Sequence, residues 1–123
     1  MKSGSFRTFV LVVAAVVLLL ACGKKLSESE RSYAEACVKI NNNLSQKGEA
    51  SRKLCECTAA IVVPKLTQGE LNAYVNSVDL MGKVMTPEAM AQRGFTLAEF
   101  TSLGQKRQAS FPEMRKTCGG ESF

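Results

Sequence analysis

The sequence predicts an all-α fold, a small irregular bundle of about five helices that is stapled by two disulfides. First, the spacing of a helix-capping box recurs along the chain. Second, apolar residues between these boxes recur every three or four positions, as on one face of a helix, and no stretch shows sustained strand alternation. Third, four cysteines in a small exported domain predict two bridges.

The first 22 residues have the layout of a signal peptide. Lys2 and Arg7 precede an apolar run, and small residues follow it. The stretch from Phe9 to Cys22 holds 14 residues without a charge. A membrane-spanning helix needs about 20 such residues, so we expect a segment that is removed.

The stretch LLACG, residues 19–23, resembles the lipobox of bacterial lipoproteins. The resemblance implies that the thiol of Cys22 receives a diacylglycerol and that the chain is cut just before Cys22, with the new amino group often acylated too. Residues 1–21 would then be the signal peptide, and residues 22–26 the lipidated cysteine and a short tether. One acyl chain binds a bilayer only marginally, whereas two or three hold a protein there. The alternative is a plain secreted protein in which Cys22 keeps a free thiol.

The residue after the lipobox cysteine indicates which of the two bacterial membranes holds the protein. In bacterial lipoproteins, an Asp after the lipidated cysteine commonly retains the protein at the inner membrane. This chain has Gly23 at that position. The resemblance therefore implies a lipid-anchored protein of the bacterial cell envelope, at the outer membrane and facing the periplasm.

Residues 27–118 are expected to form the helical domain, with 119–123 as a C-terminal tail. Capping-box spacing begins at Ser27, Thr67, Thr96 and Ser110, and Thr86 precedes a proline that suits a first helical turn. These signals predict helices at about 28–44, 49–63, 68–84, 87–93 and 97–109, with a short final turn at 111–117.

The apolar residues of these helices indicate which faces are buried. One predicted face holds Tyr33, Ala36, Cys37, Ile40 and Leu44, and another holds Leu71, Tyr74, Val75 and Val78. Phe95 and Phe100 flank the predicted start of a helix at the spacing of a hydrophobic staple. We therefore expect the two phenylalanines to touch.

Four cysteines remain in the domain: Cys37, Cys55, Cys57 and Cys118. Residues two apart in a helix point about 200° from one another, so Cys55 and Cys57 should bond to different elements. Both lie nearly level with Cys37 in an antiparallel hairpin. By a small margin, this placement favours the pairs Cys37–Cys57 and Cys55–Cys118.

Composition excludes several classes of function. Without Lys2 and Arg7, 14 basic residues stand against 11 acidic ones, a net charge of +3 that is spread evenly. We therefore expect no nucleic-acid partner. The chain has no histidine, which removes the commonest general base and the commonest zinc ligand. We expect no catalytic residue, no metal site and no cofactor.

These observations favour a non-enzymatic, membrane-anchored envelope lipoprotein that binds another protein or supports an assembly. An inhibitor or immunity protein and an accessory subunit both belong to this class. The expected partners are the lipid bilayer, through acylated Cys22, and a protein of unknown identity.

Two alternatives remain open. The first is a periplasmic thiol–disulfide oxidoreductase that uses Cys55 and Cys57, with Glu56 assisting proton transfer. The second is a carrier of a small apolar ligand, because methionines at helical positions can surround a cavity: Met81, Met85, Met90 and Met114.

Overall fold

A computed structural model describes residues 25–43 and 48–122 of the chain. The predicted signal peptide and Cys22 lie outside the described residues. Within those two ranges every regular element is helical, so the predicted all-α class is confirmed. Six α-helices and two short 3₁₀ turns follow in order: α2 (Glu28–Asn43), α3 (Glu49–Val62), η1 (Val63–Lys65), α4 (Gln68–Ser77), η2 (Val78–Leu80), α5 (Pro87–Gln92), α6 (Leu97–Ala109) and α7 (Phe111–Cys118).

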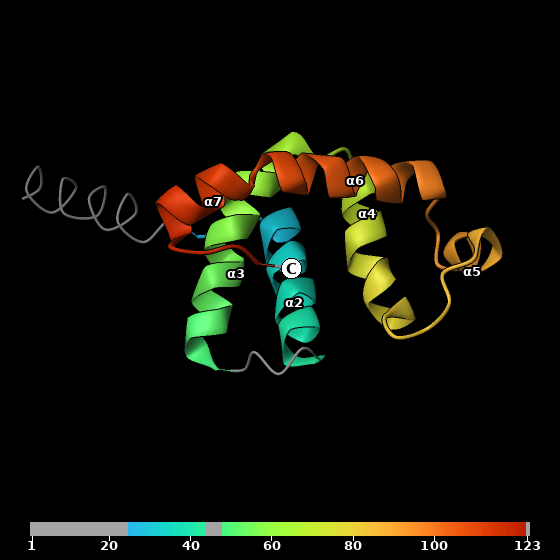
Figure 1. The fold of residues 1–123 in the computed structure, drawn as a ribbon, viewed down its shortest axis with the longest axis horizontal. Coiled ribbons are helices and arrows are strands. Elements are labelled where there is room, and N and C mark those ends of the chain that lie inside the picture. Colours follow the sequence, from blue (N-terminus) through green and yellow to red (C-terminus); the bar gives the residue numbers. More distant parts are fainter. Residues whose placement is uncertain (1–24, 44–47, 123) are drawn as a thin grey trace, which may run out of the picture.

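The bundle is built on a hairpin of α2 and α3, which lie side by side (Figure 1). Helix α4 stands next to α2, and α6 and α7 lie across the ends of these three helices. Helix α6 packs chiefly on α4, and α7 packs chiefly on α3. The short α5 lies at the far side of α4. This crossing arrangement makes the bundle irregular.

Most helix starts are those that the capping signals predict. The Thr67 hydroxyl accepts the Glu70 N–H at 3.2 Å, and the Glu70 carboxylate accepts the Thr67 N–H at 2.7 Å. Thr96 and Glu99 form the same reciprocal box. Phe95 and Phe100 have their ring centroids 6.0 Å apart, so the predicted contact between them is confirmed.

The predicted capping box at Ser110 is wrong. Ser110 keeps a helical backbone between α6 and α7, and its side chain makes no capping bond to α7. Its Oγ instead donates to the carbonyl of Lys106 at 2.9 Å. Because one helix runs almost directly into the next, no extended residue is available to act as a cap.

The helix predicted at 68–84 is shorter in the structure. Helix α4 ends at Ser77, whose hydroxyl donates to the Tyr74 carbonyl at 2.9 Å, and η2 follows. The tighter 3₁₀ turn brings Leu80 into the core at 5% exposure. Gly82, at φ 78°, then takes the chain out of helical conformation. Burial of Leu80 therefore prevails over the local helical pattern.

The core lies where α2, α3 and α4 meet the two crossing helices. The rings of Tyr33 and Tyr74 stack with their centroids 4.0 Å apart and join α2 to α4. The other buried apolar residues come from the six α-helices, from η2 and from the loop before α6: Ala34, Ala36, Cys37, Ile40, Cys55, Ala59, Val62, Leu71, Ala73, Leu80, Met90, Phe95, Leu103 and Met114.

The described part of the predicted tail packs onto the domain. Gly119 ends α7 in the left-handed region, at φ 78°, and turns the chain back. Ser122 is only 2% exposed, and its hydroxyl lies 2.7 Å from that of Thr58 on α3. Residues up to Ser122 therefore belong structurally to the helical domain.

Candidate functional site

The four domain cysteines form two disulfides, Cys37–Cys55 and Cys57–Cys118, with Cα–Cα distances of 5.6 and 5.8 Å. The prediction of two bridges, with Cys55 and Cys57 bonded to different elements, is confirmed. The favoured pairs, Cys37–Cys57 and Cys55–Cys118, are wrong. Cys22, the predicted lipidation site, lies outside the described residues.

The buried face of α3 explains the pairing. Cys55 is fully buried and lies on the same face as Ala59 and Val62, four and seven residues on. Cys37 is fully buried on α2, the helix with which α3 packs most extensively. Cys57 is half-buried and bonds to Cys118 on α7, the other helix that packs on α3. Cys55 and Cys57 are both level with Cys37 along the hairpin, so their level does not decide the pairing. The pairing depends on the face of α3 on which each cysteine lies.

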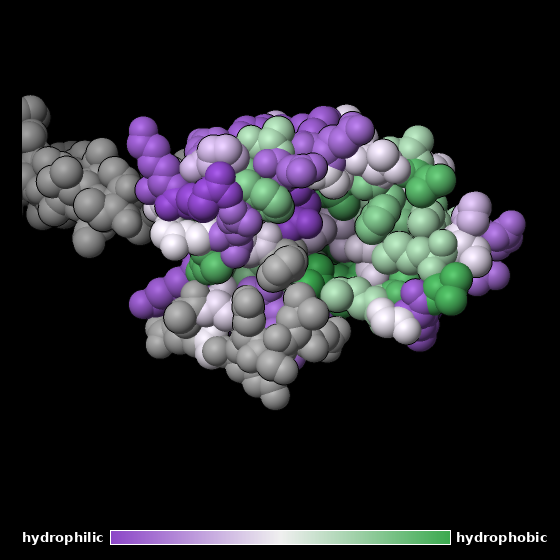
Figure 2. All heavy atoms as spheres, viewed as in Figure 1, coloured by the Kyte–Doolittle hydropathy of each residue, from purple (hydrophilic) through white to green (hydrophobic). Residues whose placement is uncertain are grey.

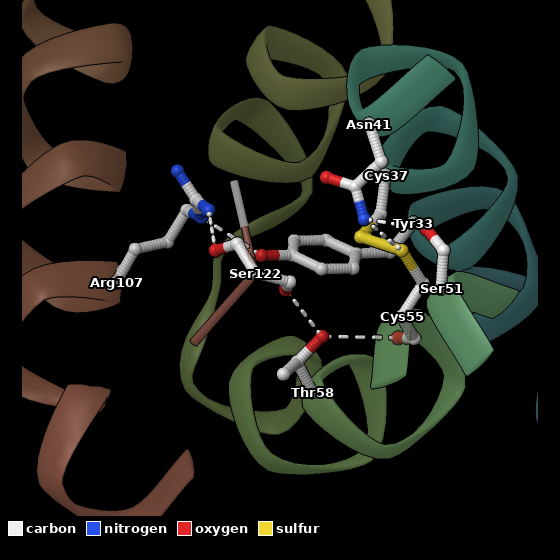
Figure 3. Close-up of a disulfide and its surroundings, with 8 residues drawn as sticks. All are labelled: Tyr33, Cys37, Asn41, Ser51, Cys55, Thr58, Arg107 and Ser122. Carbon is white, nitrogen blue, oxygen red and sulfur yellow. Dashed lines mark hydrogen bonds between the residues drawn. A yellow bond between two sulfur atoms is a disulfide. The ribbon is translucent and has the colours of Figure 1, made fainter. Parts of the chain in front are cut away.

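Polar groups surround the buried bridge (Figure 3). Asn41 is fully buried, and its side-chain nitrogen donates to the Ser51 hydroxyl at 2.8 Å and lies 3.4 Å from the Cys55 sulfur. Thr58 donates to the Cys55 carbonyl at 3.1 Å. The Oδ1 atom of Asn41 has no hydrogen-bond partner within the described ranges. The bridge is thus held in the packed interior and is remote from solvent.

Arg107 is the centre of a second polar cluster, at the edge of the core. Its Nε donates to the Tyr33 hydroxyl at 2.8 Å, and its Nη2 donates to the Ser122 carbonyl at 2.7 Å (Figure 3). Its guanidinium carbon lies 5.0 Å from the centroid of the Tyr74 ring. Burial raises the pKa of Tyr33 and of Tyr74, so both phenols stay neutral. Arg107 therefore has only neutral partners in the described part of the chain.

A buried carboxylate ties α4 to α6. Glu70 is 3% exposed, accepts a hydrogen bond from Lys106 Nζ at 2.6 Å and accepts another from the Ser102 hydroxyl. Burial alone would raise the pKa of Glu70, but hydrogen bonds from Lys106, Ser102 and Thr67 outweigh it and lower the pKa to about 2. Because its charge is fully paired, Glu70 has a structural role.

An open apolar groove of about 260 Å³ lies between α2, α4 with η2, and α6. Figure 2 shows hydrophobic surface gathered on the side of the molecule where α4 and α5 lie. Of the described residues that line the groove, Arg107 is the one with a charge, and none is acidic. The lining residues are Ile40, Tyr74, Ser77, Met81, Met85, Phe100, Leu103, Gly104 and Arg107.

Gly104 lies inside α6 and lines this groove. A Cβ atom at Gly104 would meet no heavy atom of a neighbouring residue within 4 Å, and its φ is not in the left-handed region. A glycine in a helix interior costs about 1 kcal/mol relative to alanine. Neither packing nor backbone conformation within the domain requires glycine here, so its effect is to leave space in the groove.

The predicted methionine cluster divides into two. Met81 and Met85 are half-buried and line the groove, whereas Met90 and Met114 are buried in the core. Gly104 and the guanidinium of Arg107 are site residues that the sequence interpretation missed. A glycine inside the helix predicted at 97–109 was the one available signal for the groove.

Within residues 25–43 and 48–122, no three or more His, Cys, Asp or Glu side chains lie close enough to hold a metal ion. None of the helices in these ranges is both long and apolar enough to cross a membrane. Comparisons with protein-family models, with curated proteins and with solved structures found no match.

Proposed function

We propose that this chain is a lipid-anchored protein of the bacterial envelope whose helical domain binds a protein partner and catalyses no reaction. The observation that carries the proposal is the open apolar groove with Met81 and Met85 in its wall. Apolar hollows on small domains are common sites of protein interaction. Flexible, polarisable methionine side chains adapt to apolar partners of varied shape.

The lipobox-like stretch, residues 19–23, supports the anchor. A tether over residues 22–26 would reach at most about 17 Å when fully extended. Helix α2 begins at Glu28, only six positions after Cys22. An acylated Cys22 would therefore hold the domain beside the bilayer, where it would meet other envelope proteins. Gly23, in place of the Asp that commonly retains lipoproteins at the inner membrane, supports a location at the outer membrane.

The arrangement of the bridges favours structural cysteines over a redox-active pair. A dithiol catalyst cycles between two free thiols and one bridge within the same pair. In this chain Cys55 is 0% exposed and joined to Cys37, while Cys57 is joined to Cys118 on another helix. The two sulfurs of the Cys-Glu-Cys stretch thus belong to separate staples.

The openness of the groove favours a protein segment over a small apolar ligand. Pockets that enclose small molecules usually measure about 300–1,000 Å³ and bury most of the ligand. This groove, at about 260 Å³, lies near the lower end of that range and is open to solvent, so it would not enclose such a ligand. An occupant that stays attached to a larger body fits such a shape better than a molecule that has to be enclosed.

The Cys22→Ser variant tests the anchor. We expect a precursor that keeps its 21-residue signal and is about 2 kDa heavier, because the thiol that receives the lipid is absent. Immunoblots of fractionated cells measure its mass and location. A Gly23→Asp variant is the matched control, which should be processed normally but stay at the inner membrane. Normal cleavage of Cys22→Ser to a soluble periplasmic protein would contradict the anchor.

In-cell cross-linking tests the binding role. A photo-cross-linking residue is placed in the full chain at exposed positions on three faces, one chain per position: Glu35 on α2, Val84 between the groove methionines, and Lys116 on α7. A discrete adduct with one envelope protein from at least one position supports the proposal. Irradiated cells that yield no adduct from any of the three contradict it.

A further inference from the structure

We propose that the groove accepts an acidic amphipathic segment of the partner protein. An apolar side chain of that segment would lie over Gly104, between Met85 and Phe100, and a neighbouring carboxylate would bind Arg107. This inference rests on the proposed binding role and specifies the chemistry that the partner presents.

The open space at Gly104 is the basis for the proposed apolar contact. Any other residue at this position would project a side chain into space that is open in the unbound domain. Helix stability alone favours alanine by about 1 kcal/mol. The space beside Met85 and Phe100 is therefore of the kind that an apolar side chain from outside would fill, and filling it would bury surface that is now exposed to water.

Arg107 is the basis for the proposed contact with a carboxylate of the partner. Its partners, the Tyr33 hydroxyl, the Ser122 carbonyl and the Tyr74 ring, are all neutral. Figure 3 shows one terminal nitrogen of Arg107 directed away from Ser122. A half-buried guanidinium beside apolar surface attracts a carboxylate more strongly than an exposed one, and its planar fork suits two parallel hydrogen bonds.

The charge and the openness of the groove together favour an acidic segment as its occupant. Among the described residues, no acidic side chain lines the groove, and the expected mature chain has a net charge of +3. A second copy of this chain would bring the same sign of charge, whereas an acidic segment brings the opposite sign. Because the groove is open along one side, the backbone of the bound segment can remain outside while one apolar side chain enters.

Gly104→Phe in the full chain, held in lipid nanodiscs, is the central test. A Cβ atom at Gly104 meets no heavy atom of a neighbouring residue within 4 Å, and the added phenyl ring would project into the groove. Gln105→Phe is the matched control, since it adds the same ring at an exposed neighbouring position outside the groove. The probe is a dye-labelled helical peptide of leucine and glutamate, and its twin carries lysine in place of glutamate. Fluorescence anisotropy measures both dissociation constants.

We expect the glutamate peptide to bind the natural chain at least 10-fold more tightly than its lysine twin. Gly104→Phe should raise the dissociation constant of the glutamate peptide at least 10-fold, while Gln105→Phe should leave that constant unchanged. Arg107→Met should remove the preference for glutamate. Lys116→Met, which removes a charge from the exposed face of α7, should keep the preference. Circular dichroism and disulfide mapping confirm that each variant is folded.

Four results would overturn the inference. Gly104→Phe that binds like the natural chain would exclude the groove, and equal binding of the two peptides would exclude the role of Arg107. Binding of decanoate at the groove, without binding of either peptide, would point to a small apolar ligand. If in-cell adducts form at Lys116 but not at Val84, the protein-binding role stands and only its assignment to the groove fails.

Discussion

At the scale of single residues, Glu70 has two structural roles. Its carboxylate closes the capping box of Thr67, which starts α4, and it also accepts bonds from Lys106 and Ser102 on α6. A local signal in the sequence therefore predicts half of its environment. Because the other half comes from a helix more than thirty residues away, only the fold reveals it.

Glu70 should give the stability of the domain an acid-sensitive component. Its pKa is lowered from the ordinary 4.5 to about 2 in the folded chain, so the folded state favours the charged carboxylate. The resulting stabilisation is present above pH 4.5 and is lost as the pH falls towards 2. Thermal melts between pH 2 and 7 should show a smaller acid-induced fall in Tm for Glu70→Gln, which also has the lower Tm at pH 7.

Glu35→Gln, which changes an exposed carboxylate on α2, is the control for that series. It should follow the natural chain over the whole pH range. If the Tm of Glu70→Gln depended on pH as steeply as that of the natural chain, the folded-state carboxylate would not be stabilised as described.

Gly104→Ala should stabilise the domain. The new methyl group meets no neighbour within 4 Å, and alanine is the better helix former by about 1 kcal/mol. For a domain of this size the Tm should rise by about 4–8 °C. Differential scanning calorimetry measures the change. A fall in Tm would mean that the space beside Gly104 is closed, which would remove the basis of the proposed apolar contact.

At the scale of the elements, local signals predict where helices start better than where they end. Thr67, Thr86 and Thr96 all cap helices as predicted, because an N-cap hydrogen bond needs only residues within one turn. The end of α4 at Ser77 depends on burial of Leu80, which the local pattern does not contain. The groove was beyond prediction for the same reason, since its walls come from three separate helices.

The longer bridge closes a large loop and joins α3 to α7, which also pack on each other, so its removal should be costly. Cys57 and Cys118 are 61 residues apart, and closing a loop of that length contributes about 4 kcal/mol in the chain-entropy estimate. Both cysteines are half-buried, so serine at both positions should fit. The Cys57→Ser, Cys118→Ser double variant should lose more than 10 °C in Tm by calorimetry.

Peptide mapping provides the control on the disulfide pairing. The unreduced protein is denatured and digested with a protease that cleaves after glutamate. Glu56 separates the two cysteines of α3, so cleavage there places them on different peptides. Mass spectrometry should find Cys55 linked to Cys37 and Cys57 linked to Cys118. A peptide that links Cys37 to Cys57 would contradict the structure, and in that case the double serine variant would leave two unpaired thiols.

At the scale of the whole molecule, three separate devices close a small bundle. The bridges join α2 to α3 and α3 to α7, the Glu70 cluster joins α4 to α6, and Arg107 holds the chain near Ser122 against the core. A domain of about 90 residues buries only a modest apolar core. These cross-links therefore supply a large share of the stability.

The bridges also have a consequence for how the molecule is made. They connect cysteines in chain order, the first of the domain to the second and the third to the fourth. If the chain is exported as proposed, with its N-terminus first, Cys37 and Cys55 meet an oxidase before Cys57 emerges, and Cys118 arrives last. Pairing in order of emergence then yields the native bridges without reshuffling. Cells that lack a disulfide isomerase should accumulate the protein at an undiminished level, whereas a nested pairing would depend on that enzyme.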